Sequence, residues 1–149
     1  MRLDRRWIAA HVPHAGRMCL LDEVMNWSAE RISCRSGTHR APDHPLRSHG
    51  RLGAVCGIEY AAQAMAVHGA LIGADVGGPA RAGLLASVRS VRLHVTRLDD
   101  VESDLFCDAV RMAGERGMVL YEFEVRSAQQ VLLHGRAAVV LDIDAGRRA

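Results

Sequence analysis

Two side chains near the middle of the chain have the chemical types of an acid–base pair. His49 lies in a polar, turn-rich stretch, and Glu59 follows ten residues later in an almost entirely apolar stretch. An imidazole exchanges protons near neutral pH, and a carboxyl group among apolar side chains tends to keep its proton. Together they can remove a proton from one atom and deliver a proton to another.

The residues between this pair offer a place for negative charge. Residues 53–56 (Gly-Ala-Val-Cys) stand where the apolar stretch begins. In the first turn of a helix the N–H groups have no partner within the helix, and the helix dipole favours anions. We therefore expect the amides of Ala54, Val55 and Cys56 to face a developing oxyanion.

Other roles for these residues stay open. His44, before Pro45, is a second candidate base, and Cys56 with His49 has the types of a nucleophilic pair. A cysteine on a buried helix is more commonly a packing residue, and Glu59 has the alternative role of a structural carboxylate. No group of His, Cys, Asp and Glu has metal-ligand spacing, so we predict no metal site.

Composition narrows the class of protein. The 149 residues, 49% of them hydrophobic and 24% charged, are typical of one globular domain spanning 1–149. All 19 basic residues are arginine, which excludes a Schiff-base lysine, a pyridoxal phosphate linkage and a Walker-type lysine. Aromatic residues make up 4%, and no long basic run occurs, so we expect no nucleic-acid partner.

Four cysteines occur, at positions 19, 34, 56 and 107, without a C-x-x-C pair. That spacing argues against a zinc ribbon or a thioredoxin-like motif. The first residues lack a continuous apolar segment of the signal-peptide kind. We therefore expect free thiols and a cytoplasmic protein.

The pattern of apolar residues predicts the elements that position these side chains. A short N-terminal helix within the first twelve residues precedes two short strands, 19–27 and 31–38, and a loop at 39–50. The stretch 53–73 is nearly all apolar and predicts one buried helix rather than a membrane span, because Glu59, Gln63 and His68 interrupt it. Four strands with a period of two follow, at 83–96, 104–112, 118–126 and 130–143.

Hairpin-sized breaks at 114–117 and 127–129 predict antiparallel neighbours among the last strands. The predicted order is two strands, one buried helix and four more strands. The six strands can bury this helix if their sheet curls around it. We predict an α+β hotdog fold, a curved antiparallel sheet wrapped around one long central helix. The long strand from Leu84 to Val95 must otherwise leave an exposed edge, so we expect it to pair with its equivalent in a dimer.

Three motifs then resemble one family. The residues Gly57 to Gln63 read G-I-E-Y-A-A-Q, similar to the helix motif E-A-M-A-Q, which in the aryl-polyene pigment branch is often G-I-E-Y-M-A-Q. The opening resembles P-H-x-x-P-F-L-L-V-D-x-V through Pro13, His14, Met18, Leu20, Leu21, Asp22 and Val24. Val91 to Val95, before Asp99, is similar to F-R-R-P-V-x-P-G-D. The chain thus resembles the 3-hydroxyacyl-ACP dehydratases of the FabZ/FabA class, and in particular their ApeP-like pigment branch.

The resemblance implies dehydration of a 3-hydroxyacyl thioester on an acyl carrier protein, with His49 as base and Glu59 as acid. It implies substrate-binding residues at Gly53, Ala54, Val55, Cys56 and Gln63, and no cofactor. The family's catalytic loop places its histidine fourteen residues before the helix carboxylate. Here His49 stands ten residues before Glu59, whereas His44 keeps nearly the family spacing. His49, in Ser48-His49-Gly50, best matches the glycine-flanked catalytic histidine of the family, and we therefore prefer it.

The implied partners are the carrier protein, with its phosphopantetheine-linked substrate, and a second hotdog subunit, either identical or related. No membrane partner is expected. Arg51, Arg92 and Arg97 are candidate contacts for the acidic carrier. Two other functions stay open: a non-catalytic subunit of a heterodimeric dehydratase, and a hotdog acyl thioesterase.

Overall fold

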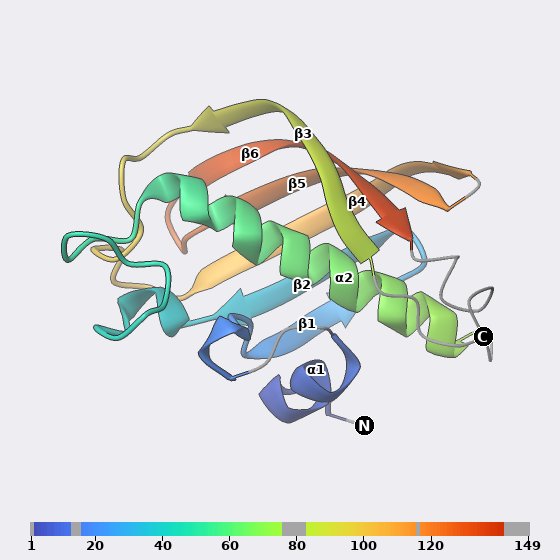
Figure 1. The fold of residues 1–149 in the computed structure, drawn as a ribbon, viewed down its shortest axis with the longest axis horizontal. Helices are drawn as coiled ribbons and strands as arrows, with labels where there is room; N and C mark the ends of the chain where they lie inside the picture. Colours follow the sequence, from blue (N-terminus) through green and yellow to red (C-terminus); the bar gives the residue numbers. More distant parts are fainter. Residues whose placement is uncertain (1, 13–15, 76–82, 116, 142–149) are drawn as a thin grey trace.

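The computed structural model of the chain describes residues 2–12, 16–75, 83–115 and 117–141. Six strands form one antiparallel sheet in the order β1-β2-β4-β5-β6-β3, which curls around a long helix, α2 (Figure 1). The strands are β1 (Glu23–Trp27), β2 (Arg31–Ser36), β3 (Gly83–Leu93), β4 (Leu105–Glu115), β5 (Met118–Arg126) and β6 (Val131–Leu141). The predicted hotdog fold is confirmed.

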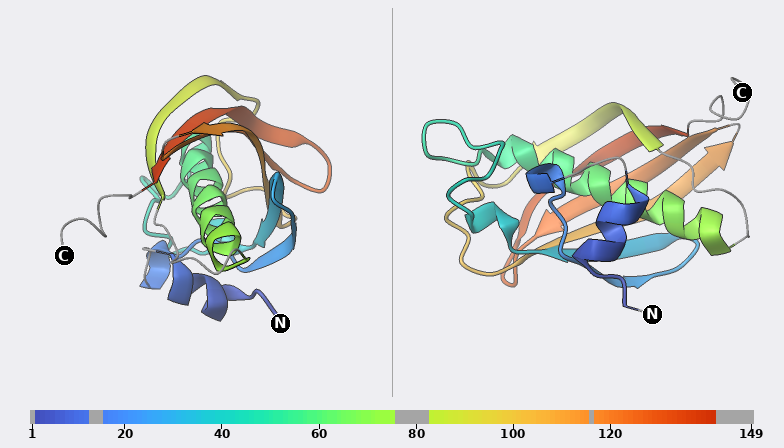
Figure 2. Two further views of the ribbon diagram at one scale, coloured as in Figure 1. Left: turned by 90° about the vertical axis from the view of Figure 1, so that its right-hand side faces the viewer. Right: turned by 60° about the horizontal axis from the view of Figure 1, so that its bottom comes forward.

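The helix α2 (Gly57–Asp75) lies in the hollow of the sheet, and one 3₁₀ turn, Ala54–Cys56, leads into it (Figure 2). By length and composition the stretch Ala54–Gly73 could cross a membrane, but 61% of it is buried inside the protein, as in a core helix. The helix approaches the sheet closely because Gly57 has no side chain: a Cβ there would collide with Leu133 of β6. Residues 76–82, between α2 and β3, lie outside the described residues.

The strand β5 shows how the pattern of residues builds the core. Its burial alternates along the strand, with Val119, Tyr121, Phe123 and Val125 facing α2. A strand places successive side chains on opposite faces, so this alternation turns one face of the sheet toward the helix and the other toward solvent. Both predicted hairpins, β4–β5 and β5–β6, are present.

The two edges of the sheet differ. Beside β1, the N-terminal segment adds a bridge between Asp4 and Glu23, and the Val24 N–H donates to the Leu3 carbonyl at 2.8 Å. Asp4 also caps the short helix α1 (Arg5–His11), which packs beside α2 (Figure 2). Within the described part of one chain, β3 pairs with β6 alone, so its other edge is open.

The strand β3 departs from the predicted alternation. Its pairing with β6 shifts between Arg89 and Arg92, and Ser90 between them has a φ of 55°. Because of this bulge, Arg89 and Arg92 lie opposite outward residues of β6, whereas Val88 and Leu93 lie opposite inward ones. The predicted period of two over 83–96 would place Val88 and Arg92 on one face, and the bulge makes this prediction wrong. Val88 and Leu93 face inward and yet are exposed, because none of the described elements of this chain covers the β3 edge.

Candidate active site

Glu59 stands in the first turn of α2 and is half-buried. The side-chain amide of Gln63, one turn further along the helix, donates to Glu59 Oε1 at 3.2 Å. That same amide nitrogen donates to the Met18 carbonyl at 2.7 Å, and its oxygen accepts from the Leu20 N–H at 2.9 Å. Gln63 is fully buried and connects the catalytic-acid candidate to the chain before β1. This geometry favours a positioning role for Gln63 over direct contact with substrate.

His49 lies at the tip of a tight turn. Ser48 and Arg51 pair through reciprocal backbone hydrogen bonds of 2.9 and 3.1 Å, and His49 and Gly50 between them have φ angles of 53° and 74°. Two consecutive positive φ angles are the pattern of a type I′ turn. The imidazole is exposed, and its Nδ1 lies 3.0 Å from Ser48 Oγ. The turn therefore points the ring away from its own chain.

The guanidinium of Arg47 ties this turn to the loop that precedes it. It donates to the Gly50 carbonyl at 3.1 Å and to the Arg40 carbonyl at 3.3 Å. Among the described residues, no hydrogen bond or ion pair joins His49 to Glu59. The loop that carries His49 and the first turn of α2, which carries Glu59, lie at the same end of the molecule (Figure 1).

The alternative base, His44, has a different environment. It is buried, its Nδ1 accepts from the Leu46 N–H at 3.0 Å, and its Nε2 lies 2.9 Å from the Tyr60 hydroxyl. Because Nδ1 accepts, the proton of the neutral ring is on Nε2, which donates to Tyr60. The Tyr60 hydroxyl lies 2.7 Å from Thr38 Oγ1, which donates to the Leu20 carbonyl at 2.8 Å. Burial lowers the pKa of His44 and raises that of Tyr60. Both ring nitrogens of His44 thus serve the packing of the loop on α2.

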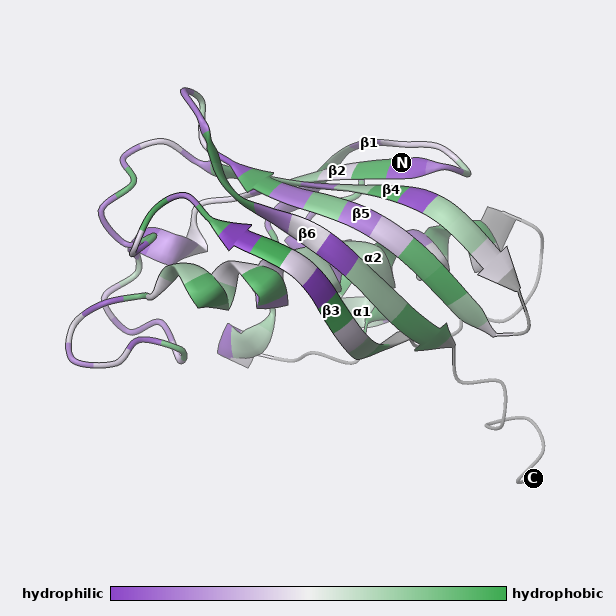
Figure 3. Cartoon of the chain, turned by 90° about the horizontal axis from the view of Figure 1, so that it is seen from above, coloured by the Kyte–Doolittle hydropathy of each residue, from purple (hydrophilic) through white to green (hydrophobic). Residues whose placement is uncertain are grey.

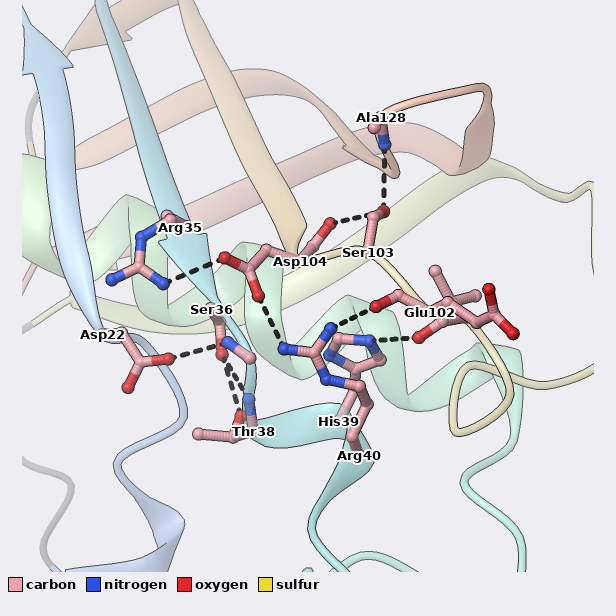
Figure 4. Close-up of polar contacts among 12 residues, drawn as sticks. Asp22, Arg35, Ser36, Thr38, His39, Arg40, Glu102, Ser103, Asp104 and Ala128 are labelled. Atoms are coloured by element: carbon pink, nitrogen blue, oxygen red, sulfur yellow. Dashed lines mark hydrogen bonds and ion pairs between the residues drawn. The ribbon is translucent and has the colours of Figure 1, made fainter.

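The residues before the His44 loop are held by a polar network at the end of β2 (Figure 4). Asp104 accepts from Arg35 at 3.1 Å and from Arg40 at 2.7 Å. Asp22 accepts from the Gly37 N–H at 2.7 Å, and buried His39 bonds the Val101 carbonyl at 2.9 Å. These contacts fix the start of the loop that carries both candidate histidines.

The backbone at the start of the helix is only partly available to a ligand. The Ala54 N–H donates to the Thr96 carbonyl at 3.1 Å, and the Cys56 N–H donates to the Gly53 carbonyl at 3.0 Å. Two of the three amides expected to face an oxyanion thus have acceptors within the chain. Between them lies Val55, whose side chain is 59% exposed. Its amide is the remaining candidate donor of the three.

The loop after β3 holds this helix start in place. Asp99 accepts from the Leu52 N–H at 2.9 Å and from the Arg97 guanidinium, and the Leu98 N–H donates to the Leu52 carbonyl at 2.8 Å. Its hydrogen bond with Arg97 keeps the pKa of Asp99 well below its usual range. Arg97 is therefore engaged inside the chain and less available to a carrier protein than exposed Arg51.

The structure also bears on two other candidate chemistries, a cysteine nucleophile and a metal site. Burial raises the pKa of Cys56, which disfavours the thiolate that a nucleophile needs. In the described residues, no three His, Cys, Asp or Glu side chains are grouped as metal ligands. The motif residues Pro13 and His14 lie outside the described residues.

The sequence analysis missed the chain of contacts from His44 through Tyr60 to Thr38. The one available signal was Tyr60 itself, a hydroxyl in an otherwise apolar stretch directly after Glu59. A buried tyrosine needs a partner for its hydroxyl, but nothing local in the sequence says which residue supplies it.

Comparison with solved structures supports the same fold. The dehydratase heterocomplex ApeI:P from Xenorhabdus doucetiae is similar with a TM-score of 0.83, 24% identity and coverage of 93% of this chain and 92% of that chain. The S. sahachiroi protein AziG gives a TM-score of 0.61 at 14% identity, covering 83% of this chain and 91% of that one. Thioesterase HI1161 from Haemophilus influenzae gives 0.52 at 9% identity, with coverage of 80% and 76%.

A search among curated protein sequences found no match. A family model does match: the one described as ApeP dehydratase, ApeP-like, covers residues 6–145. This match spans the helix with Glu59, the loop with both candidate histidines and all six strands. The chain therefore belongs to the ApeP-like dehydratase family.

Proposed function

We propose that this protein acts in the dehydration of a 3-hydroxyacyl thioester carried by an acyl carrier protein, as one of two hotdog subunits in a cytoplasmic dimer. The observation that carries the proposal is Glu59, held by buried Gln63 at the start of an apolar helix, beside exposed Val55. A carboxyl group in that position can deliver a proton in surroundings with little water.

In the proposed reaction, His49 removes a proton from C2 of the substrate. The electron pair moves into the thioester, whose oxygen gains charge beside the Val55 amide and the N-terminal end of α2. Glu59 then protonates the 3-hydroxyl, which leaves as water when the C2–C3 double bond forms. The product is the trans-2-enoyl thioester, and the elimination needs no metal or organic cofactor.

The geometry favours a site shared between two subunits. His49 points away from its own chain, and the β3 edge is open next to the exposed, inward-facing side chains of Val88 and Leu93. We propose that a second hotdog chain pairs with this edge and that His49 of one subunit faces a substrate held beside the helix of the other. Since the ApeI:P structure is a heterocomplex, a related dehydratase is one candidate for that second chain.

A non-catalytic role within such a heterodimer is the second candidate function. It is favoured by the shorter loop before α2, in which His49 stands ten residues before Glu59, whereas the family's catalytic histidine stands fourteen residues before the helix carboxylate. The thioesterase alternative is supported by similarity of fold alone, at 9% identity.

The decisive experiment measures products from a 3-hydroxyacyl carrier-protein thioester, with this chain alone and with a partner dehydratase. Loss of water with the thioester intact supports the proposal, whereas a free acid product supports thioesterase activity. Activity that appears only with the partner and survives Glu59→Gln in this chain would assign the non-catalytic role.

A further inference from the structure

Figure 3 shows the face of the sheet that points away from α2. The register of the strands places the outward residues of this face in rows across the sheet. We call the part formed by β4, β5, β6 and β3 the outer face. Two neighbouring rows are charged, and the figure shows them in purple on β5 and β6. Read from β5 through β6 to β3, these rows are Glu124–His134–Arg92 and Glu122–Arg136–Arg89. Each row is acidic at the β5 end and basic at the β3 end.

The remaining part of the outer face is apolar and uneven in shape. Leu120 and Met118 of β5 and Met112 of β4 are 44, 45 and 56% exposed. Across the strands from Leu120 stand the small residues Ala138 of β6 and Ser87 of β3. A hollow of about 450 Å³ lies over these small residues, with the three large side chains along its other side. Large residues thus occupy the β4–β5 half, and small ones the β6–β3 half.

We propose that the outer face binds the outer face of a second copy of this chain. The two copies are related by a two-fold axis that lies between β5 and β6, parallel to the strands. This axis exchanges the β5 half with the β3 half and keeps each row at its own height. Because this axis lies midway between β5 and β6, Glu122 and Glu124 of one copy then face Arg136 and His134 of the other, and the large apolar side chains enter the partner's hollow. A two-fold axis across the strands would place charged rows on apolar ones, so the pattern selects the first arrangement.

The size of the outer face fits such an interface. Strands lie about 4.8 Å apart and same-face residues about 6.8 Å apart, so four strands and four rows cover roughly 500 Å² in projection. That value is of the same order as the ~800 Å² of accessible surface that each partner buries in a stable interface. The apolar contacts supply most of the affinity, and the charges supply orientation and partner choice.

The charges remain available for this role. Within the chain, Glu122 and Arg136 form an ion pair at 3.4 Å, yet their side chains are 47 and 71% exposed. Such exposed pairs contribute little to the stability of a single chain. The outer face is also separate from the β3 edge, so both contacts can form together and give an assembly of four chains.

The first test measures molar mass by sedimentation equilibrium for the full-length chain and for Leu120→Glu. We expect the variant to raise the dissociation constant of the face-to-face contact at least tenfold and to leave the far-UV spectrum unchanged. The matched control is Met25→Glu, which changes an exposed apolar residue of β1, outside the outer face. Leu93→Asp, directed at the β3 edge, should reduce the mass through edge pairing alone, so the two contacts are measured separately.

The second test uses charge reversal. Glu122→Arg/Glu124→Arg makes the charged rows entirely basic, and His134→Glu/Arg136→Glu gives the facing residues of β6 the opposite charge. Each double variant alone should lose the face-to-face contact, and an equal mixture of the two should regain it. Three results would overturn the proposal. The parent chain does not self-associate through this face, Leu120→Glu leaves the molar mass unchanged, or the mixture of double variants shows no association beyond that of each variant alone. Binding of the face to carrier protein or to lipid vesicles in place of a second copy would also overturn it.

Discussion

Mild acid should destabilise this protein through its buried histidines. His39 and His68 are fully buried and His44 nearly so, and burial lowers the pKa of each below its ordinary value near 6.5. As the pH falls below about 6.5, the histidines of the unfolded chain therefore bind protons, whereas the buried histidines of the native chain stay neutral. Stability is at its full value above that pH and decreases as the pH falls toward the lowered values.

The contacts of His68 make it the best position for testing this reasoning. Its Nε2 donates to the Ser28 carbonyl at 2.7 Å, and its Nδ1 lies 2.7 Å from the Tyr121 hydroxyl. Because the carbonyl can only accept, the neutral ring holds its proton on Nε2 and accepts from Tyr121. A second proton on the ring would reverse the hydrogen bond with Tyr121 and would place a charge inside the core, between α2 and β5.

The number of buried histidines determines how steeply the free energy of unfolding changes with pH. Each histidine that is neutral in the native state and protonated in the unfolded state changes the free energy of unfolding by about 1.4 kcal/mol per pH unit. Three such groups give a slope of up to roughly 4 kcal/mol per pH unit below pH 6.5. The contribution of each histidine ends when the pH reaches its lowered native pKa, so the total loss of stability depends on how far the three pKa values are lowered.

The assay is urea unfolding followed by far-UV circular dichroism at several pH values between 7.5 and 5. His68→Gln keeps one donor and one acceptor without a titrating ring, and should reduce the slope by about one third, or about 1.4 kcal/mol per pH unit. The control His11→Gln changes an exposed histidine and should keep the parent slope. Equal slopes for the parent and His68→Gln would refute the reasoning.

Four further predictions concern the site and the assembly. Glu59→Gln should lower dehydration by roughly a hundred- to ten-thousand-fold, because the amide cannot deliver a proton, and unchanged turnover would exclude Glu59 as the acid. His49→Ala should abolish activity with little change in stability, whereas His44→Ala should reduce activity less and lower the urea midpoint, since His44 is buried against Tyr60; the reverse pattern of activities would favour His44 as the base. Gly57→Ala should cost about 1–3 kcal/mol of stability in urea unfolding, because the new methyl group meets buried Leu133; a neutral effect would mean that the helix can move away from the sheet. At micromolar concentrations, light scattering should show at least a dimer through the β3 edge, and monomeric behaviour would contradict edge pairing.

The strand β5 shows how much the sequence alone determined. Its predicted limits, Met118 to Arg126, are those of the structure, because a half-buried strand alternates apolar and polar residues with a period of two. The buried helix was equally predictable, since a long stretch of small and apolar residues interrupted by Glu59 and Gln63 must be enclosed by other elements. Together, one enclosed helix and six strands leave few architectures, and the hotdog fold is the one that buries the helix.

Contacts between distant residues required the tertiary structure. The bulge at Ser90 turns Arg89 and Arg92 to the same face, and only the register with β6 reveals this. Gln63 bonds to Met18 and Leu20, more than forty residues away in the chain, so the sequence shows its buried amide without its partners.

The two loop histidines also differ in a way that the sequence does not show and the tertiary structure does. His44 and His49 have the same titrating ring and lie five residues apart in the same polar stretch. The structure separates them by environment: a buried ring with both nitrogens engaged, and an exposed ring at the tip of a turn. Periodicity reports burial because burial follows local spacing along a strand or helix. The environment of a loop side chain depends on which distant hydroxyl or carbonyl the folded chain brings beside it, and that is decided only when the tertiary structure forms.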